Sequence, residues 1–345
     1  MNFLRKIVYP FAVLYGVITS IRNFLYDKNF LKSTKFKTPT LVVGNLSVGG
    51  TGKTPQIEYL IRLLQNDYKV AVLSRGYKRK SKGFIIADEK ASAELIGDEP
   101  FQYYKKFKNI LVCVDADRTN AIKKLEKLEN PPEVILLDDA FQHRKVVGGL
   151  NILLTDFNNL YVNDSMLPTG NLREHTSGAK RAQLIIVTKC PKSLSEKKQL
   201  AVTKRINPLK NQSVFFTAID YNPIIKGIND ISLSELKNYE VLLVTGIANS
   251  APLTQFLEEN NINYTHLKYP DHYNFSNQDI YQIHQRLDDF KSKKNLVLTT
   301  EKDYVRIFGK VKELHYLSIK TVVINHKNDF DKKIKYYVEQ SSGNS

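Results

Sequence analysis

The octapeptide Ser47-Val-Gly-Gly-Thr-Gly-Lys-Thr54 is the most informative part of this chain of 345 residues. It matches the phosphate-loop pattern G-x-x-x-x-G-K-[ST] except at Ser47, which stands in place of the first glycine. In such a loop successive backbone N–H groups point at phosphate oxygens, while Lys53 would reach the β- and γ-phosphates and the Thr54 hydroxyl would ligate magnesium. The residues that we expect to hold a nucleoside triphosphate are Ser47, Val48, Gly49, Gly50, Thr51, Gly52, Lys53 and Thr54.

The flanking segments supply the structural context that this motif requires. An apolar strand is predicted over 41–44 before the loop, and an amphipathic helix is predicted over 55–65 after it. A second apolar run, 134–137, ends in Asp138 and Asp139. Carboxylates at the end of such a strand hold magnesium opposite the phosphate loop in nucleotide-binding proteins. Together, the loop and the acid-ended strand predict a site for Mg²⁺ and a nucleotide.

The rest of the chain alternates apolar, β-branched runs with helical periodicity, which is the pattern of a mostly parallel, doubly wound sheet. Most of these runs lack the alternation of a half-exposed strand, so both of their faces are expected to be covered. The predicted strands are 41–44, 69–73, 110–114, 134–137, 151–154, 184–188 and 214–218. We therefore predict the α/β fold of a P-loop NTPase.

A change of pattern near Asn222-Pro223 indicates a domain boundary. Beyond it the sequence restarts, and further strands are predicted at 241–245, 296–299 and 322–324. We interpret this part as a second, smaller α/β domain that closes over the active site. The expected organisation is a membrane-associated helix in residues 1–30, a P-loop core in 31–222 and the smaller domain in 223–345.

Lysine and arginine outnumber aspartate and glutamate by 51 to 35, which gives a formal net charge of +16. Such a charge favours anionic partners, namely nucleotides, phosphorylated substrates, nucleic acid or an acidic membrane surface, but it does not choose among them. The two cysteines, Cys113 and Cys190, lie in strand-like apolar runs without metal-ligand spacing. We expect them to pack in the core of a protein from a reducing compartment.

The N-terminal segment is apolar but short for a membrane span. Residues 7–21 form an uncharged run of 15, whereas a full span needs about 20. A signal peptide, a buried core helix and a helix lying in the membrane interface are the three alternatives, and no Ala-x-Ala cleavage site follows the run. We favour the interfacial helix, because residues 1–40 carry seven basic side chains against one acid. Each basic charge near an anionic leaflet adds about 1 kcal/mol to binding.

Three further motifs carry charged side chains, and each leaves two interpretations open. Asp98, in a Gly-Asp-Glu-Pro turn, is either a helix cap or a general base that takes a proton from a sugar hydroxyl, and the spacing alone favours the cap. Arg173 either neutralises phosphate charge in the transition state or pairs with Glu174. Arg75, just after a predicted strand, either binds phosphate or is solvated.

Taken together, these motifs resemble those of the tetraacyldisaccharide 4'-kinase family, the membrane-associated kinases of lipid A synthesis. The resemblance covers most of the chain, and Ser47 suits this family, which carries Ser or Thr at that position. His175 departs from the proline expected after Leu-Arg-Glu. The matching segments are 43–55, Ser74-Arg-Gly-Tyr77, Gly97-Asp-Glu-Pro100, Asp138-Asp-Ala-Phe-Gln-His-Arg144, Leu167-Pro-Thr-Gly-Asn-Leu-Arg-Glu174, Asp271-His-Tyr-Asn-Phe275 and Thr300-Glu-Lys-Asp303.

The resemblance implies an ATP-dependent kinase that phosphorylates the 4'-hydroxyl of a tetraacylated glucosamine disaccharide 1-phosphate. It implies that Asp98 is the base, that His272 orients it, and that Arg173 stabilises the transferring charge. The residues that would hold Mg²⁺ and ATP include Lys53, Thr54, Asp138 and Asp139. The candidates for supporting groups around them are Arg75, Glu99, Gln142 and Glu174.

The implied location is the cytoplasmic face of the inner membrane, where the chain would be attached peripherally or anchored by its N-terminus. No nucleic-acid partner is implied, and a monomer is expected. The main alternative is a membrane-attached P-loop NTPase switch that acts on a protein partner, but the Asn-Lys-x-Asp motif of GTPase base recognition is missing from the sequence. A nucleic-acid NTPase ranks lower, because the basic residues are spread along the chain without a recognised binding module.

Overall fold

The computed structural model describes residues 8–271, 273–292 and 294–342, so that His272 lies outside the described residues. The strands of the larger sheet are β1 Thr40–Asn45, β2 Val70–Ser74, β3 Ile85–Ile86, β4 Leu111–Val114, β5 Val134–Asp138, β6 Leu150–Asp156, β7 Leu184–Thr188, β8 Ser213–Tyr221 and β15 Ile319–Val323. Those of the smaller sheet are β9 Ile224–Gly227, β10 Ile231–Ser232, β11 Glu240–Thr245, β12 Tyr264–Lys268, β13 Asn295–Thr300 and β14 Leu314–Leu317. The α-helices are α2 Tyr9–Asp27, α3 Lys53–Leu64, α4 Ala93–Ile96, α5 Asp98–Lys106, α6 Arg118–Leu125, α7 Glu196–Ile206, α8 Leu233–Leu236, α9 Ala251–Glu259, α10 Asn277–Asp288, α11 Glu301–Ile307 and α12 Lys327–Ser342.

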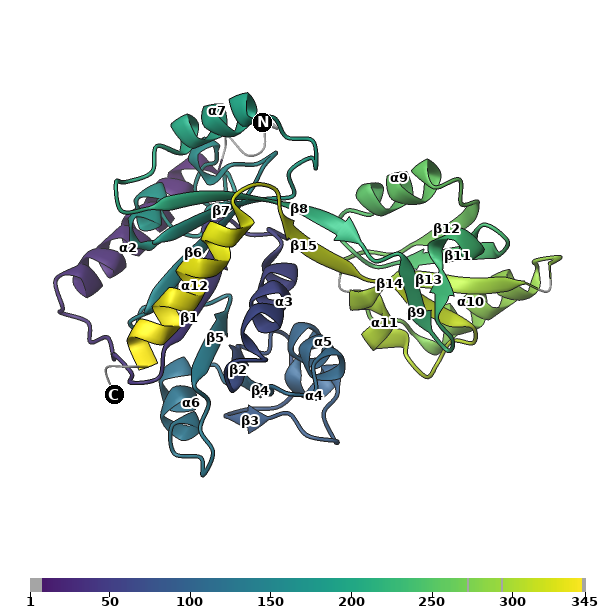
Figure 1. The fold of residues 1–345 in the computed structure, drawn as a ribbon, viewed down its shortest axis with the longest axis horizontal. Helices are drawn as coiled ribbons and strands as arrows, with labels where there is room; N and C mark the ends of the chain where they lie inside the picture. The colour runs from purple at the N-terminus through teal and green to yellow at the C-terminus, as the bar shows by residue number, and fades with distance from the viewer. Residues whose placement is uncertain (1–7, 272, 293, 343–345) are drawn as a thin grey trace.

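The larger sheet has the strand order β15-β8-β7-β6-β1-β5-β2-β4-β3 (Figure 1). Its neighbouring strands are parallel except at the two edges, where β3 runs antiparallel to β4 and β15 runs antiparallel to β8. The smaller sheet has the order β10-β9-β14-β13-β11-β12 and is parallel from β14 to β12. The predicted α/β fold with a mostly parallel sheet is confirmed.

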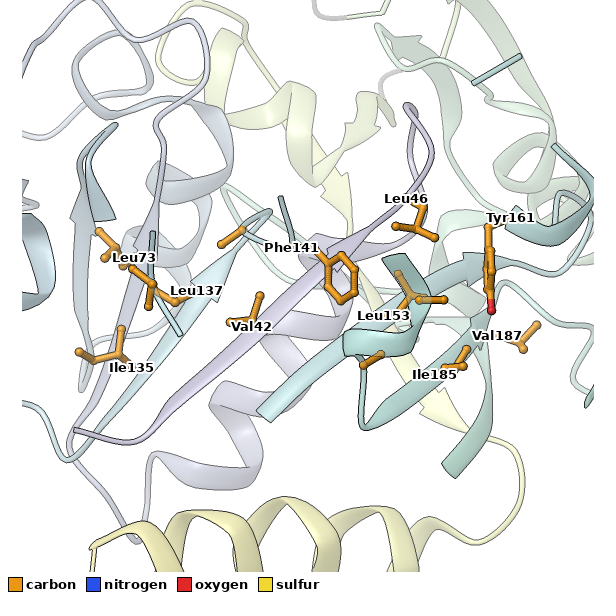
Figure 2. Close-up of a cluster of buried hydrophobic side chains, with 14 of the residues drawn as sticks. Val42, Leu46, Leu73, Ile135, Leu137, Phe141, Leu153, Tyr161, Ile185 and Val187 are labelled. Atoms are coloured by element: carbon orange, nitrogen blue, oxygen red, sulfur yellow. The ribbon is translucent and has the colours of Figure 1, made fainter. Parts of the chain in front are cut away.

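Two apolar layers cover the larger sheet. On one face α3 and α12 pack on the strands, and the apolar stripe of α3 is completely buried at Ile57, Leu60, Ile61 and Leu64. On the other face α6 and α7 cover a cluster of side chains from β1, β2, β5, β6 and β7 (Figure 2). Burying one such aliphatic side chain stabilises the fold by roughly 1.5–3 kcal/mol relative to exposure. Cys113 and Cys190 are buried and free, as expected for core packing.

The strand order places the two predicted nucleotide motifs side by side. β1, which leads into the phosphate loop, pairs with β5 so that Val43 lies opposite Asp138. Gly44 permits the chain after β5 to approach β1, because a Cβ at this position would lie 2.6 Å from the Cβ of Phe141. The carboxyl ends of parallel strands meet at one edge of the sheet, and this edge carries the site.

The predicted boundaries of the smaller domain are wrong at the C-terminal end. β15 belongs to the larger sheet, where Ile319 pairs with Tyr221 on β8, and the following helix α12 packs Phe330 against Phe215 at a ring distance of 5.0 Å. The smaller sheet is therefore confined to residues 224–317, and β8 and β15 are the two connections to it (Figure 1). An apolar run such as 322–324 has the same pattern whichever sheet it joins.

Helix α11 of the smaller unit packs against α5 of the larger one through a buried charge cluster. Lys106 on α5 lies 2.7 Å from Glu58 on α3 and 2.8 Å from Glu301 on α11. The Glu58 side chain is only 1% exposed, and Gln102 donates a further hydrogen bond to it at 2.9 Å. Burial, followed by the charge of Glu58, raises the pKa of Glu301 from 4.5 to about 7. Lys106 thus bridges two buried carboxylates that belong to different units, and Arg62 adds a second cation 2.9 Å from Glu58.

We expect this cluster to make stability depend on pH. The pKa of Glu301 is higher in the folded state than in the unfolded state, so the folded protein binds its proton more tightly and the free energy of unfolding falls as pH rises from about 4.5 to about 7. The change is on the order of 3 kcal/mol. Glu301→Gln should lack it, whereas the exposed control Glu129→Gln should retain it. Urea unfolding at a series of pH values measures the difference, and parallel curves for wild type and Glu301→Gln would contradict the assignment.

Candidate active site

The phosphate loop joins β1 to α3 with an open inner surface. Gly52 has a φ of +83° at the start of α3, and Gly49 has a φ of +106°, so both adopt a conformation that favours glycine. A Cβ at Gly49 or Gly50 would meet no atom within 4 Å, which means that this part of the loop faces open space. The Thr51 hydroxyl is buried without a hydrogen-bond partner. These features fit a loop that surrounds phosphate oxygens.

Two neighbouring segments hold the loop in place. Val48 N–H donates to the carbonyl of Asn171 at 2.8 Å, and Arg173 N–H donates to the carbonyl of Leu46 at 2.7 Å. From the other side, the Thr188 hydroxyl at the end of β7 donates to the carbonyl of Thr51 at 2.8 Å. The segment that carries Arg173 is therefore fixed to the phosphate loop by its backbone as well as by its side chain.

Lys53, Arg173 and Asp139 form a charge cluster at the mouth of the loop. Arg173 contacts both carboxylate oxygens of Asp139, at 2.8 Å and 3.2 Å, and Lys53 Nζ lies 3.8 Å from the same carboxylate. The Asn45 side-chain oxygen accepts from Lys53 at 3.3 Å and also from Arg173. Burial alone would raise the pKa of Asp139, but the Lys53 and Arg173 charges outweigh it and lower that pKa below its usual range. The side chains of Lys53 and Arg173 thus place two positive charges beside the phosphate loop, where they could contact phosphate oxygens.

Asp138 is the more deeply buried of the two predicted metal ligands. Burial first, and then the charges of Asp139 and Glu99, raise the pKa of its carboxyl to about 7. The Tyr103 hydroxyl lies 3.5 Å from the Asp138 carboxylate. Burial first, and then the charge of Asp138, raise the pKa of this hydroxyl, whereas its hydrogen bond with Thr54 lowers that pKa. Thr54, Glu99 and the two aspartates are therefore neighbours.

This donor set fits magnesium in its chemistry. In the described part of the chain no group of three or more His, Cys, Asp or Glu side chains could hold a metal ion. Magnesium does not require one, because it is usually bound by one or two carboxylates together with nucleotide phosphates and water. The Thr54 hydroxyl and the carboxylates of Asp138 and Asp139 supply protein oxygens of the appropriate kind.

Glu174 and Gln142 support the loops around this cluster. Glu174 is buried and accepts from Arg181 at 2.7 Å, from Gln142 at 2.8 Å and from Asn23 of α2 at 2.8 Å. Gln142 also donates to the carbonyl of Asn45 at 2.9 Å. The alternative that Arg173 pairs with Glu174 is wrong, since Arg173 pairs with Asp139 and Arg181 pairs with Glu174.

Asp98 is the first residue of α5 and does not cap it. The capping position is occupied by Gly97, and no side chain accepts a capping hydrogen bond there. The helix-cap interpretation favoured by spacing is therefore wrong. The Asp98 carboxylate instead accepts a hydrogen bond from Arg306 Nε of α11 at 3.1 Å. The Asp98 side chain is 22% exposed at the junction of α5 and α11.

Arg75 and three residues without a predicted role complete the site. Arg75 is exposed just past β2, close to the buried Arg118, whose pKa is lowered to about 10 by burial and further by Arg75. Arg118, Tyr103 and Asn45 were not among the residues predicted for the site. Asn45 lies two residues before the phosphate loop, so its position beside that motif could have indicated a role in the site. Tyr103 and Arg118 lie in helices outside the predicted motifs, and nothing in the sequence around them indicates such a role.

A phosphate loop between β1 and α3, beside a strand that ends in two carboxylates, defines a P-loop protein that acts on a nucleoside triphosphate. The family model described as "Tetraacyldisaccharide-1-P 4'-kinase" matches residues 4–339. The chain therefore belongs to the tetraacyldisaccharide-1-P 4'-kinase family, as its motifs predicted.

Individual relatives agree with this assignment. The chain is 54% identical over 344 residues to the tetraacyldisaccharide 4'-kinase of Flavobacterium johnsoniae, with 99% of each chain covered. It is 41% identical over 362 residues to the protein of that name from Bacteroides thetaiotaomicron, covering 99% of this chain and 95% of the relative. The solved structure of the Aquifex aeolicus family member in complex with ATP matches with a TM-score of 0.78 and 33% identity, covering 97% of this chain and 99% of that one.

Proposed function

We propose that this chain transfers the γ-phosphate of ATP to the 4'-hydroxyl of a tetraacylated glucosamine disaccharide 1-phosphate, with Mg²⁺ as the metal. Membership of the kinase family supports the reaction class and the acceptor. The observation that carries the proposal is the convergence of Lys53 and Arg173 on Asp139 at the open phosphate loop. Two cations held beside such a loop are suited to the charge that develops on a transferring phosphoryl group.

Each side chain has a defined task in this reaction. Lys53 and Arg173 neutralise the phosphate oxygens, and Asp98 accepts the proton of the 4'-hydroxyl as its oxygen attacks the γ-phosphorus and ADP leaves. Thr54, Asp138 and Asp139 would hold Mg²⁺, which supplies positive charge to the β- and γ-phosphate oxygens. The role of His272 in orienting Asp98 stays a prediction.

Label transfer from [γ-³²P]ATP tests the proposal. Incubation with Mg²⁺ and the disaccharide 1-phosphate should move the label into the lipid fraction, as followed by thin-layer chromatography. An NTPase switch would release the label as free phosphate without consuming the lipid. The latter result, together with ATP turnover that does not respond to the acceptor, would favour the alternative.

We further propose that α2 lies on the inner-membrane surface at its cytoplasmic face. One side of this helix exposes large apolar side chains at Phe11, Val13, Leu14, Val17, Ile18, Ile21 and Phe24. Among the residues that the structure describes, none of the helices combines the length and apolarity that a membrane span needs. An exposed apolar stripe on a single helix suits binding in the plane of a bilayer.

The opposite side of α2 is bonded to the site. Tyr15 donates to the carbonyl of Arg173 at 2.9 Å, and Asn23 donates to the carboxylate of Glu174 at 2.8 Å. Arg144 in turn donates to the carbonyl of Asn23 at 2.8 Å. The helix thus joins its apolar surface to the segment that carries Arg173, so an acceptor held in the bilayer would be near the phosphate loop.

Adding two charges to the apolar side of α2 should abolish membrane binding. Phe11 and Ile18 are 65% and 56% exposed, so Phe11→Asp with Ile18→Asp removes apolar contact without disturbing the core. Losing two such side chains from the bilayer reduces binding by roughly 3–6 kcal/mol. Co-sedimentation with anionic phospholipid vesicles measures the fraction of protein bound to the membrane. Leu200→Asp, on the exposed side of α7 at 62%, is the matched control, and vesicle binding by the double variant equal to that of the control would contradict the orientation.

A further inference from the structure

Arg306 of the smaller unit reaches across to the carboxylate of Asp98 in the larger one. Its Nε lies 3.1 Å from Asp98 Oδ2, and its Nη2 contacts the same oxygen. The Arg306 side chain is 7% exposed, so the contact is sheltered from water and is stronger than an ordinary surface ion pair. Both hydrogen bonds converge on Oδ2.

Arg306 is itself held by a fully buried carboxylate. Asp303, one turn earlier on α11, lies 3.4 Å from Arg306 Nη1. Asp303 also accepts from the N–H of Gly246 at 2.9 Å and from the Thr300 hydroxyl at 2.8 Å. A Cβ at Gly246 would lie 3.0 Å from Asp303, so this glycine lets the backbone after β11 approach the carboxylate. The guanidinium therefore has a rigid support within the smaller sheet.

The same helix makes two further charged contacts around the site. Glu301 pairs with Lys106 at the other end of α5, and Lys302 lies 3.2 Å from Asp271. Helix α11 thus contacts both ends of the helix that begins with Asp98. The Thr300-Glu-Lys-Asp303 motif, which had no assigned task, forms the first turn of this helix.

We propose that Arg306 is a positioning residue for the phosphoryl transfer, which it serves by fixing the carboxylate of Asp98. This inference rests on the proposed function, in which Asp98 is the base. With its carboxylate held by the guanidinium, Asp98 takes the proton of the acceptor hydroxyl. The bond from the hydroxyl oxygen to the γ-phosphorus forms as the bond from that phosphorus to ADP breaks, and the proton remains on Asp98. The planar fork of arginine restricts rotation of the carboxylate in a way that a single ammonium cannot.

Substitution of Arg306 should affect the rate of transfer and leave nucleotide binding intact. We expect Arg306→Gln to lower kcat about 10–100-fold with an unchanged KM for ATP, because a misplaced catalytic group costs up to about 10²-fold. Arg306→Lys should recover part of the loss, since it keeps the charge and loses the fork. Arg286→Gln, an exposed arginine on α10 of the same unit, is the control and should behave as wild type.

A double-mutant cycle with Asp98→Asn distinguishes positioning from a general structural effect. If Arg306 acts through Asp98, then Arg306→Gln should cause no further loss of kcat in the Asp98→Asn background. A loss that multiplies that of Asp98→Asn would overturn the proposal, as would wild-type kcat in both Arg306 variants. If Arg306→Gln proves unfolded in a thermal scan, the same double-mutant cycle is measured with Arg306→Lys in its place, and the same two outcomes apply. Full activity of Asp98→Asn alone would instead refute the proposed base, so the two failures are distinguishable.

Discussion

Replacing Lys53 with alanine is expected to lower phosphoryl transfer by at least about 10²–10³-fold, the effect of removing one preorganised donor from a developing charge. Lys53 is the first residue of α3, and its ammonium lies 3.3 Å from Asn45 and 3.8 Å from Asp139. No other lysine occupies this loop, and Arg173 is already bonded to both of these partners. Initial rates of label transfer at saturating acceptor measure the loss.

A second lysine provides the control for this substitution. Lys335 on α12 also forms an ion pair, with Asp67 at 2.6 Å, but it lies outside the site, so Lys335→Ala should keep the wild-type rate. Transfer by Lys53→Ala at a rate close to that of the control would show that the loop does not hold the triphosphate in the way described.

Replacing Asp98 with asparagine is expected to lower kcat by about 10²–10⁴-fold, which is the usual contribution of a general base. Asparagine has nearly the same shape, so the helix start at Gly97 and the packing of α5 should persist. The affinity for ATP should not change, because Asp98 lies at the start of α5, where it contacts α11, outside the phosphate loop 47–54. Rapid-quench measurement of one turnover and equilibrium binding of ATP separate the two effects.

Substitution of an aspartate elsewhere on the surface is the control for this result. Asp67→Asn removes a carboxylate that is paired with Lys335, remote from the site, and it should leave kcat unchanged. If the Asp98→Asn enzyme had the same kcat as this control, a group other than Asp98 would have to accept the proton. Weaker ATP binding with unchanged kcat would assign Asp98 to the nucleotide site instead.

Local patterns in the sequence predicted the fold because they report burial directly. The stripe of α3 is buried along its whole length, and the apolar runs at β1 and β5 form adjacent central strands. The position of Asp138 at the end of β5 followed from the apolar run 134–137 that precedes it. Its place beside the phosphate loop reflects the rule that the carboxyl ends of parallel strands meet at one edge of a sheet. The order of the strands could not be derived, and so β15 was assigned to the wrong sheet.

Contacts between residues distant in sequence were the part of the site that could not be predicted. Whether Arg173 pairs with Asp139 or Glu174 depends on the competing Arg181, and whether Asp98 caps α5 depends on Gly97 and on Arg306, more than 200 residues away. The sequence limited each choice to two alternatives. Tertiary packing decided between them, and the resemblance to a known family supplied the role proposed for Asp98.

Identification of the lipid product is the decisive test of phosphoryl transfer to the 4'-hydroxyl. The purified protein is incubated with Mg²⁺, ATP and the tetraacylated disaccharide 1-phosphate, and the recovered lipid is analysed by mass spectrometry and two-dimensional ¹H–³¹P NMR. We expect one added phosphoryl group, whose phosphorus couples to the proton at the 4'-position, in an amount equal to the ADP formed. Recovery of unchanged acceptor alongside ADP and free phosphate, or phosphorylation at another position, would contradict it.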